Sequence, residues 1–221
     1  MASVQTRQPA TKRFPLPNHI WKLGLQAGAL VVLAYLQYRN YLGLRGPVTC
    51  AELEQYTGLR QTAAKRQFRT LTEHGLITEG GCPTPRLNCE KRFFTLPYEA
   101  FHLGLSSGAV AVYAFLLYRE HRSTHQCTPS LRWIGHHMGM SVNTVRKYVT
   151  ELEERGLVST EPTTVWNGDG RRRNGNLRYT ILPIQWAADR WHNRKLEELD
   201  GRLERQHVAK RLEAQRAAEA V

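Results

Sequence analysis

Residues 139–158, GMSVNTVRKYVTELEERGLV, read as a tight turn, a helix and the first step of a strand. Ser141 is a residue type that commonly caps helices. Apolar residues then recur at helical spacing and make one face, namely Val142, Val145, Val149 and Leu152. Because a short helical segment at 131–138 precedes the turn, this stretch predicts two helices joined by a glycine-centred turn, the helix-turn-helix motif.

A fainter copy, GLRQTAAKRQFRTLTEHGLI, occupies residues 58–77. The segments that precede the two copies are also related. When residues 14–41 are placed over residues 94–121, an offset of 80, 13 of 28 positions are identical, and the helix-turn-helix segments then align at an offset of 81. This repetition predicts an internal duplication. We call residues 14–92 the first repeat and residues 93–183 the second repeat.

Both repeats predict the same order of elements: an extended segment, a helix that is apolar almost all round, a short helix and the helix of the copied stretch. A helix that is apolar on every face is normally buried, so the first helix of each repeat is expected in the core. The segments are extended chain at 14–17 and 93–97, apolar helices at 27–41 and 107–121, and short helices at 50–57 and 131–138.

Three helix starts carry candidate capping residues, and two of them leave a choice open. The candidates are Thr49 with Glu52 as a capping box for the helix at 50–57, Ser106 or Ser107 for the helix at 107–121, and Thr128 or Ser130 for the helix at 131–138.

A hairpin is expected after each copied helix. In the second repeat, β-prone runs at 157–165 and 177–182 flank WNGDGRRRNGN, whose Asn-Gly pairs are strong turn signals. In the first repeat the hairpin is less clear, and residues 86–96 are expected to form its return strand. Together these elements predict a mainly α fold with small β-hairpin wings (α+β), organised as tandem winged helix-turn-helix domains plus a C-terminal helix.

The predicted domain boundaries follow the repeats. They are a flexible N-terminal arm at 1–13, a first winged-helix domain at 14–92, a second at 93–183 and a helical C-terminal tail at 184–221. The tail places Leu196, Leu199 and Leu203 at heptad spacing, but the spacing slips at Val208 and Leu212. A short coiled coil, a docking helix or a solvated helix packed loosely on the body are therefore all open.

The formal net charge is +12, and residues 184–221 contribute only +1 of it, since eight Lys or Arg face seven Asp or Glu there. The remaining +11 lies in residues 1–183. Such basicity favours nucleic acid, acidic lipid or acidic protein as a partner, against the simpler reading that it serves solubility. The N-terminus has no apolar core of a signal peptide, and the apolar stretch at 28–36 is too short to cross a bilayer. A cytoplasmic, nucleoid-associated protein without membrane contact is expected.

The second helix of a helix-turn-helix enters the major groove with its N-terminal residues at the base edges. Hydrogen-bonding and cationic side chains crowd that position in both copies, and a cationic loop tip suits phosphates or the minor groove. The acidic residues of the second copy come late in its helix, which opposes the helix dipole and argues against a merely solvated face. The candidate DNA-binding residues are Arg60, Gln61, Thr62, Lys65, Arg66 and Arg69 in the first repeat, Ser141, Asn143, Thr144, Arg146 and Lys147 in the second, and Arg171, Arg172, Arg173 and Arg178 in the second hairpin.

No motif of a nucleotide-binding loop, metalloprotease or hydrolase stands out, so no enzyme and no cofactor are predicted. Cys82 and Cys89 are spaced too widely for a zinc knuckle. A second cluster consists of His121, His125 and Cys127, but the sequence has no matching second half of a zinc site to accompany it. The prediction is that these residues bind no metal.

The second repeat, from FFTLPYEAFHLGLSSGAVAVYAFLLYRE through PSLRWIGHHMGMSVNTVRKYVTELEERGLV to DGRRRNG, resembles bacterial helix-turn-helix proteins of plasmids and conjugative elements. It is also similar to the N-terminal winged-helix domains of plasmid replication initiators. The resemblance covers most of 94–183 and, more weakly, 14–96. It implies DNA binding in a mobile element, at an origin or a promoter, with the recognition role on the five residues from Ser141 to Lys147 named above.

Several alternatives stay open. The protein is either a transcriptional regulator or a replication initiator, and the tail is a candidate contact for transcription or replication machinery. A winged-helix adaptor that meets protein is an alternative from a different class, although the cationic fronts argue against it, and RNA binding lacks the stacking aromatics it needs. Two units in one chain mimic a dimer, so a direct repeat and a palindrome are equally compatible with the sequence. The oligomeric state is open.

Overall fold

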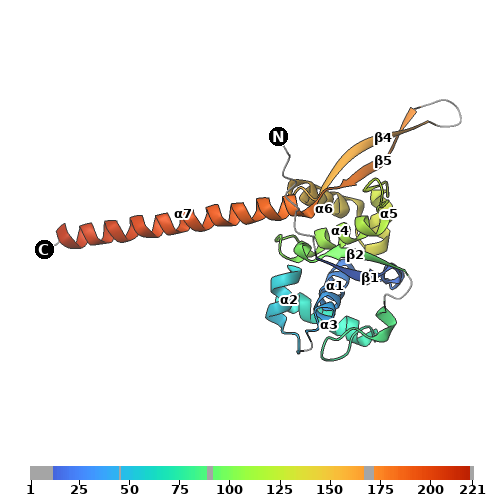
Figure 1. Cartoon of the computed structure of the whole chain (residues 1–221), viewed down its shortest axis with the longest axis horizontal. Coiled ribbons are helices and arrows are strands. Elements are labelled where there is room, and N and C mark those ends of the chain that lie inside the picture. The colour runs from blue at the N-terminus through green and yellow to red at the C-terminus, as the bar shows by residue number, and fades with distance from the viewer. Residues whose placement is uncertain (1–11, 45, 89–91, 167–171, 220–221) are drawn as a thin grey trace, which may run out of the picture.

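The structure is a computed structural model that describes residues 12–44, 46–88, 92–166 and 172–219. It is mostly helical and carries two small antiparallel sheets (Figure 1). In the first repeat the elements are β1 (Arg13–Pro17), α1 (Ala27–Tyr41), α2 (Cys50–Thr57) and α3 (Gln61–Glu73), with short 3₁₀ helices η1 (Asn18–Lys22) and η2 (Pro85–Leu87). In the second they are β2 (Phe93–Pro97), η3 (Tyr98–Phe101), α4 (Ser107–Arg119), β3 (Gln126–Cys127), α5 (Leu131–Met138), α6 (Val142–Glu154), β4 (Val158–Trp166) and β5 (Arg172–Ile181).

The helices α1 and α4 form the centre of the core, as their apolar sequences predict. They pack against each other, and each supports the third α-helix of its own repeat, α3 or α6. Gly108 allows the closest of these approaches, since a Cβ there would overlap the ring of Tyr148 on α6. The equivalent Gly28 faces Gln67 on α3, where a Cβ would lie 3.3 Å from Cγ. The close approach of Tyr148 therefore accounts for Gly108, whereas the contact at Gly28 is looser.

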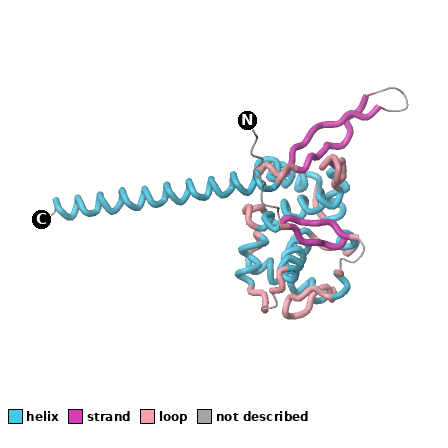
Figure 2. Tube along the Cα trace, viewed as in Figure 1, coloured by secondary structure: helices cyan, strands magenta, loops and turns pink. Residues whose placement is uncertain are grey.

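The extended segments at the start of the two repeats pair with each other, which the sequence did not predict. In the antiparallel β1–β2 ribbon, Phe14 lies opposite Leu96 and Leu16 lies opposite Phe94. Phe94 is the equivalent of Phe14, and Leu96 is the equivalent of Leu16. Each of the two phenylalanines therefore lies opposite the leucine of the other repeat. Figures 1 and 2 show this ribbon between the two repeats, with α2 and α3 on one side and α5 and α6 on the other.

The hydrogen bonds at the ends of the ribbon repeat the same exchange. Asn18 donates its backbone N–H to the Arg92 carbonyl at 3.0 Å, and Tyr98, the equivalent of Asn18, donates to the Lys12 carbonyl at 3.2 Å. Lys12 and Arg92 are likewise equivalent positions. The ribbon is therefore closed symmetrically at both ends.

Aromatic side chains of each repeat pack against the other repeat in the same reciprocal way. Trp21 of the first repeat packs on aromatic rings of the second, and Phe101, its equivalent, packs on rings of the first. The partners of Trp21 are Phe94, Phe115 and Tyr118, and those of Phe101 are Phe14, Tyr35 and Tyr38, with ring centroids between 5.0 and 6.0 Å apart. Each aromatic pair adds to the apolar area that the two repeats bury together.

The structure decides between the capping candidates. Ser106 accepts from the Ala109 N–H at the start of α4, and Ser130 accepts from the Trp133 N–H at the start of α5. Thr49 caps α2 by accepting from the Glu52 N–H.

The other half of the predicted capping box is wrong, because the Glu52 carboxylate does not turn back to Thr49. It accepts a hydrogen bond of 2.6 Å from the Tyr35 hydroxyl and pairs with Arg39 Nε at 3.0 Å. Burial, together with this bond to a carboxylate, raises the pKa of Tyr35. Glu52 thus ties α2 to α1 instead of satisfying the end of its own helix.

The hairpin expected in the first repeat is not formed as predicted. The part of 86–96 that the structure describes contains the end of η2 and the strand β2, which pairs with β1. A single bridge joins Ile77 to Pro83, and Pro83 and Pro85 cannot donate to a ladder because proline has no N–H. The second repeat does have its hairpin, with β4 and β5 antiparallel and β5 longer than the sequence suggested.

The helix α7 (Ile184–Glu219) continues from the second repeat and projects from the body (Figure 1). Its base is held by Trp191, whose ring lies under the Arg155 guanidinium at 4.2 Å and against Gly104. Beyond this base, Leu196, Leu199 and Leu203 are each about half exposed. The predicted helical tail is confirmed, and its contact with the body is confined to its first turns.

Candidate nucleic-acid interface

The helix α6 is held by an apolar back. Val145, Val149 and Leu152 are almost fully buried, which fixes the side of α6 that faces α4. The turn before α6 is equally constrained: Met140 donates its N–H to the Gly135 carbonyl at 2.9 Å, and a Cβ on Gly135 would overlap the Met140 carbonyl oxygen. The packing therefore leaves the opposite side of α6 facing outward.

That outward side, the α6 front, consists of the five residues predicted for recognition: Ser141, Asn143, Thr144, Arg146 and Lys147. Four are exposed and Thr144 is half-buried. Ser141 is the N-cap, since its hydroxyl accepts from the Thr144 N–H at 3.2 Å and lies 2.8 Å from the Thr144 hydroxyl. Asn143, Arg146 and Lys147 line a hollow of about 600 Å³ along the helix. The geometry thus keeps a neutral amide and two cations accessible to a ligand.

Two of the three carboxylates of α6 are engaged within the fold. Glu151 accepts from both the N–H and the hydroxyl of Ser106, at 2.7 and 2.6 Å, where its charge also suits the N-terminus of α4. Glu153 accepts from the Thr160 hydroxyl of β4 at 2.6 Å. Glu151 and Glu153 therefore position α6, whereas Glu154 lines the same hollow as Arg146 and Lys147.

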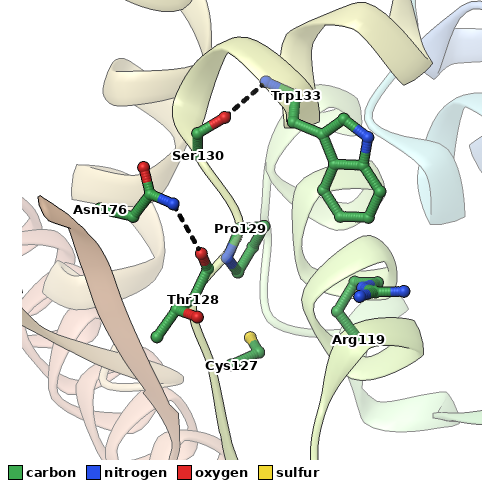
Figure 3. Close-up of a pocket in the computed structure, with 7 residues that line it drawn as sticks. All are labelled: Arg119, Cys127, Thr128, Pro129, Ser130, Trp133 and Asn176. Atoms are coloured by element: carbon green, nitrogen blue, oxygen red, sulfur yellow. Dashed lines mark hydrogen bonds between the residues drawn. The ribbon is translucent and has the colours of Figure 1, made fainter. Parts of the chain in front are cut away.

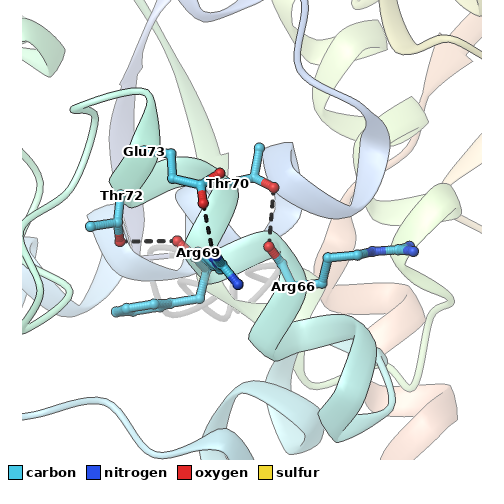
Figure 4. A network of polar contacts seen from close by, with 6 residues as sticks. Arg66, Arg69, Thr70, Thr72 and Glu73 are labelled. Carbon is cyan, nitrogen blue, oxygen red and sulfur yellow. Dashed lines mark hydrogen bonds and ion pairs between the residues drawn. The ribbon is translucent and has the colours of Figure 1, made fainter.

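The α3 front consists of Arg60, Gln61, Thr62, Lys65, Arg66 and Arg69, all exposed. Arg69 differs from the others because its Nε pairs with Glu73 at 2.8 Å, one helical turn on (Figure 4). The turn before α3 lies against the second repeat: a Cβ on Gly58 would stand 3.0 Å from the Leu105 carbonyl oxygen. The equivalent Gly139 has open space around it. The α3 front is thus accessible, but its turn is packed where that of α6 is free.

The β4–β5 hairpin is anchored beside α5. Asn176 donates to the Thr128 carbonyl at 3.1 Å, just before the Ser130 cap of α5, and Cys127 in β3 pairs with Tyr179 in β5 (Figure 3). These contacts fix the direction in which the hairpin leaves the helix-turn-helix segment.

The cations predicted on the hairpin are distributed unevenly. Arg172 and Arg173 are exposed near its far end, while Arg178 lies nearer the body and pairs with Glu161 across the ladder at 3.6 Å. Arg171 lies outside the described residues. Sequence reasoning missed Trp166, which is opposite Arg172 and 71% exposed. Its position directly before the turn was a signal that could have identified it.

Residues 103–158 match the family model of a helix-turn-helix domain. The match covers α4, α5 and α6 and reaches the first residue of β4, so it includes the whole α6 front. It indicates a DNA-binding domain. No curated protein matches the chain.

Among the described residues, no three His, Cys, Asp or Glu side chains gather where they could hold a metal ion. Cys89 lies outside the described part of the chain. Within that part, no helix combines the length and the apolar character that crossing a membrane requires.

Proposed function

We propose that the chain binds double-stranded DNA with sequence preference, through two winged helix-turn-helix units that each present a cationic recognition helix. The observation that carries the proposal is the α6 front, in which Asn143, Arg146 and Lys147 are exposed on a helix whose apolar back is buried. Asn can bond an adenine edge bidentately, and Arg and Lys suit guanine edges or phosphates.

The domain assignment belongs to the same proposal: an arm at 1–13, winged-helix domains at 14–92 and 93–183, and a tail at 184–221. The helix-turn-helix match at 103–158 supports the second domain. Support for the first comes from its helices α1, α2 and α3, which follow the same order as α4, α5 and α6. The three helices of each repeat also pack on one another in the same pairs. In the second domain the β4–β5 hairpin acts as the wing, with Arg172 and Trp166 near its end.

The proposed process is control of a mobile element, either as a regulator of its transcription or as an initiator of its replication. In both cases the DNA-bound body leaves α7 projecting, so that its exposed leucines can meet polymerase or replication proteins. Immunoprecipitation of the protein with its bound DNA from host cells would separate the two roles. Enrichment at a promoter supports regulation, and enrichment at an origin supports initiation.

A gel-shift experiment with the full chain at moderate salt tests DNA binding itself. We expect micromolar protein to retard duplex DNA, and the affinity to fall steeply with salt because phosphate contacts release counterions. Lys147→Ala should weaken binding without unfolding the chain, and Asn143→Ala should relax preference at one base pair.

The second candidate function is a protein-interaction adaptor, which the exposed Leu196, Leu199 and Leu203 on α7 favour. Failure to shift any duplex at micromolar protein would support the adaptor and contradict DNA binding.

A further inference from the structure

The strand pairing and the aromatic contacts between the repeats are those of a two-fold axis, whereas the contact of Gly58 with Leu105 has no counterpart at Gly139. Phe14 meets Leu96 while Leu16 meets Phe94, and Trp21 and Phe101 each pack into the other repeat. In an interface of this isologous kind, residue i contacts j and the equivalent of j contacts the equivalent of i. A head-to-tail arrangement of tandem copies could not produce it. The axis passes through the middle of the β1–β2 ribbon, at the pair of Pro15 and Thr95.

From this symmetry we infer that the chain recognises one duplex at two half-sites of opposite orientation and different sequence, the α6 front on one and the α3 front on the other. The inference rests on the proposed DNA binding. A two-fold axis reverses direction, so two helices related by it must read the same duplex in opposite senses. This is the reason why operator symmetry mirrors the symmetry of helix-turn-helix dimers.

The cations of the two fronts occupy equivalent positions. At the offset of 81, Lys65 corresponds to Arg146 and Arg66 corresponds to Lys147, and all four side chains are exposed. Two-fold-related cations suit a duplex, whose two phosphate backbones are themselves antiparallel. Phosphate contacts fix register and orientation without reading sequence, so the shared cations would place both fronts in the same way on their half-sites.

The residues placed to read bases are not shared. Arg60 stands where the second repeat has Ser141, and Thr62 stands where it has Asn143. Arg favours guanine through a bidentate contact and Asn favours adenine, so the two fronts have different base preferences. The shared cations would place both fronts in the same way, but the two fronts would prefer different bases. We therefore expect two half-sites of opposite orientation and different sequence, unlike the perfect palindrome that a homodimer would bind.

Selection of binding fragments from random duplex by the full chain tests the inference. We expect a bipartite motif with two dissimilar halves at a constant separation. Arg146→Ala with Lys147→Ala should remove conservation from one half, and Lys65→Ala with Arg66→Ala from the other. A motif with a single half would overturn the inference alone, whereas failure to enrich any duplex would overturn the proposed function and the inference with it.

A graft of the α6 front onto α3 determines the orientation. The variant Arg60→Ser, Thr62→Asn, Ala63→Thr gives α3 the readers of α6 at exposed or half-buried positions. Its selected motif should become a palindrome, because the same half-site would then occur twice in opposite orientation. A direct repeat, or a motif unchanged by the graft, would overturn the inference. Arg202→Ala removes an exposed cation from α7 and lies on neither front, so it is the matched control and should leave both halves unaltered. Thermal unfolding of each variant confirms that it folds.

Discussion

The two repeats solve the same packing problem with different chemistry. Arg39 in α1 and Arg119 in α4 occupy equivalent positions. Each contacts a residue of the short helix that follows, α2 or α5, and these two residues also occupy equivalent positions. In the first repeat that residue is Glu52, which forms a partly buried ion pair with Arg39 at 3.0 Å. In the second it is Trp133, whose ring lies 4.7 Å from the Arg119 guanidinium carbon (Figure 3). The two repeats therefore share the position of this arginine and of its contact, but the contacting residue is a carboxylate in the first repeat and an aromatic ring in the second.

The repeats differ more strongly around α3 and α6. The second has a long hairpin and an open turn at Gly139, whereas the first has a single bridge at Ile77 and a turn at Gly58 packed on the second repeat. The second repeat therefore exposes more groups that could contact DNA. We expect it to contribute the larger share of affinity.

The largest effect should come from Gly108→Ala, paired with Gly28→Ala. A Cβ at Gly108 overlaps the Tyr148 ring, while one at Gly28 stands 3.3 Å from the flexible Gln67 side chain. Overpacking of a tight helix contact typically costs about 1–3 kcal/mol. We expect Gly108→Ala to lower the free energy of unfolding by about 2 kcal/mol and Gly28→Ala to change it by less than about 0.5 kcal/mol, which falls within typical surface effects. Urea denaturation measures both, and equal losses would contradict the difference in packing.

Next in size is the loss of DNA affinity when cations are removed from one front. Arg146→Ala with Lys147→Ala should lower duplex affinity about tenfold, equivalent to ~1.4 kcal/mol. It should also reduce the salt slope by about one per lost phosphate contact. Lys65→Ala with Arg66→Ala should have the smaller effect, because the described residues of the first repeat form no comparable hairpin beside its front. Fluorescence anisotropy across a salt series measures both variants, and a larger loss from the α3 pair would reverse the ranking of the repeats.

A few-fold loss of affinity is expected from Trp166→Ala, at the end of the β4–β5 hairpin of the second repeat. Apolar side chains beside cations can insert into the minor groove, and Trp166 is exposed opposite Arg172. Trp186→Ala is the matched control, since Trp186 is also exposed but lies on α7. If both variants bind like the parent chain, the hairpin contributes through its arginines alone.

The smallest effect concerns pH and the contact between the repeats. Partial burial lowers the pKa of His102, which packs edge-on against Tyr56 and Tyr98 while part of its side chain stays exposed, whereas its equivalent in the first repeat is Lys22. A lowered folded-state pKa means that the unfolded chain binds the proton more readily. The stability from neutral His102 is therefore present above the ordinary pKa of 6.5 and is lost as the pH falls through the lowered value. Urea midpoints at pH 7 and pH 5 should differ more for the parent chain than for His102→Gln.

Local patterns predicted the helices well, because a helix is specified by residues within a few turns of one another. The apolar spacing of Val145, Val149 and Leu152 placed α6 and its back, and Gly139 placed the turn. The exposed α6 front followed from the same spacing. Glu151 was placed correctly on the helix, but its role at the start of α4 depends on Ser106, 45 residues earlier, and no local pattern contains that contact.

The hairpins show where local signals were sufficient and where they were not. Asn-Gly turns and β-prone runs predicted β4 and β5, although β5 begins five residues before the run that predicted it. The expected return strand at 86–96 was wrong because residues 93–97 have a better partner in β1, 80 positions away. A five-residue extended segment carries no information on which distant segment it will pair with.

Residue types and their spacing were enough to predict two similar sets of amphipathic and buried helices, an excess of positive charge and the cationic fronts of α3 and α6. These depend on residue type and on spacing within one element. The tertiary structure alone decided that equivalent strands pair with each other, that Trp21 and Phe101 are exchanged and that the repeats are consequently related by two-fold symmetry. The physical reason is that pairing and packing between distant segments depend on which surfaces fit together once the helices have formed, and that is a property of the whole chain.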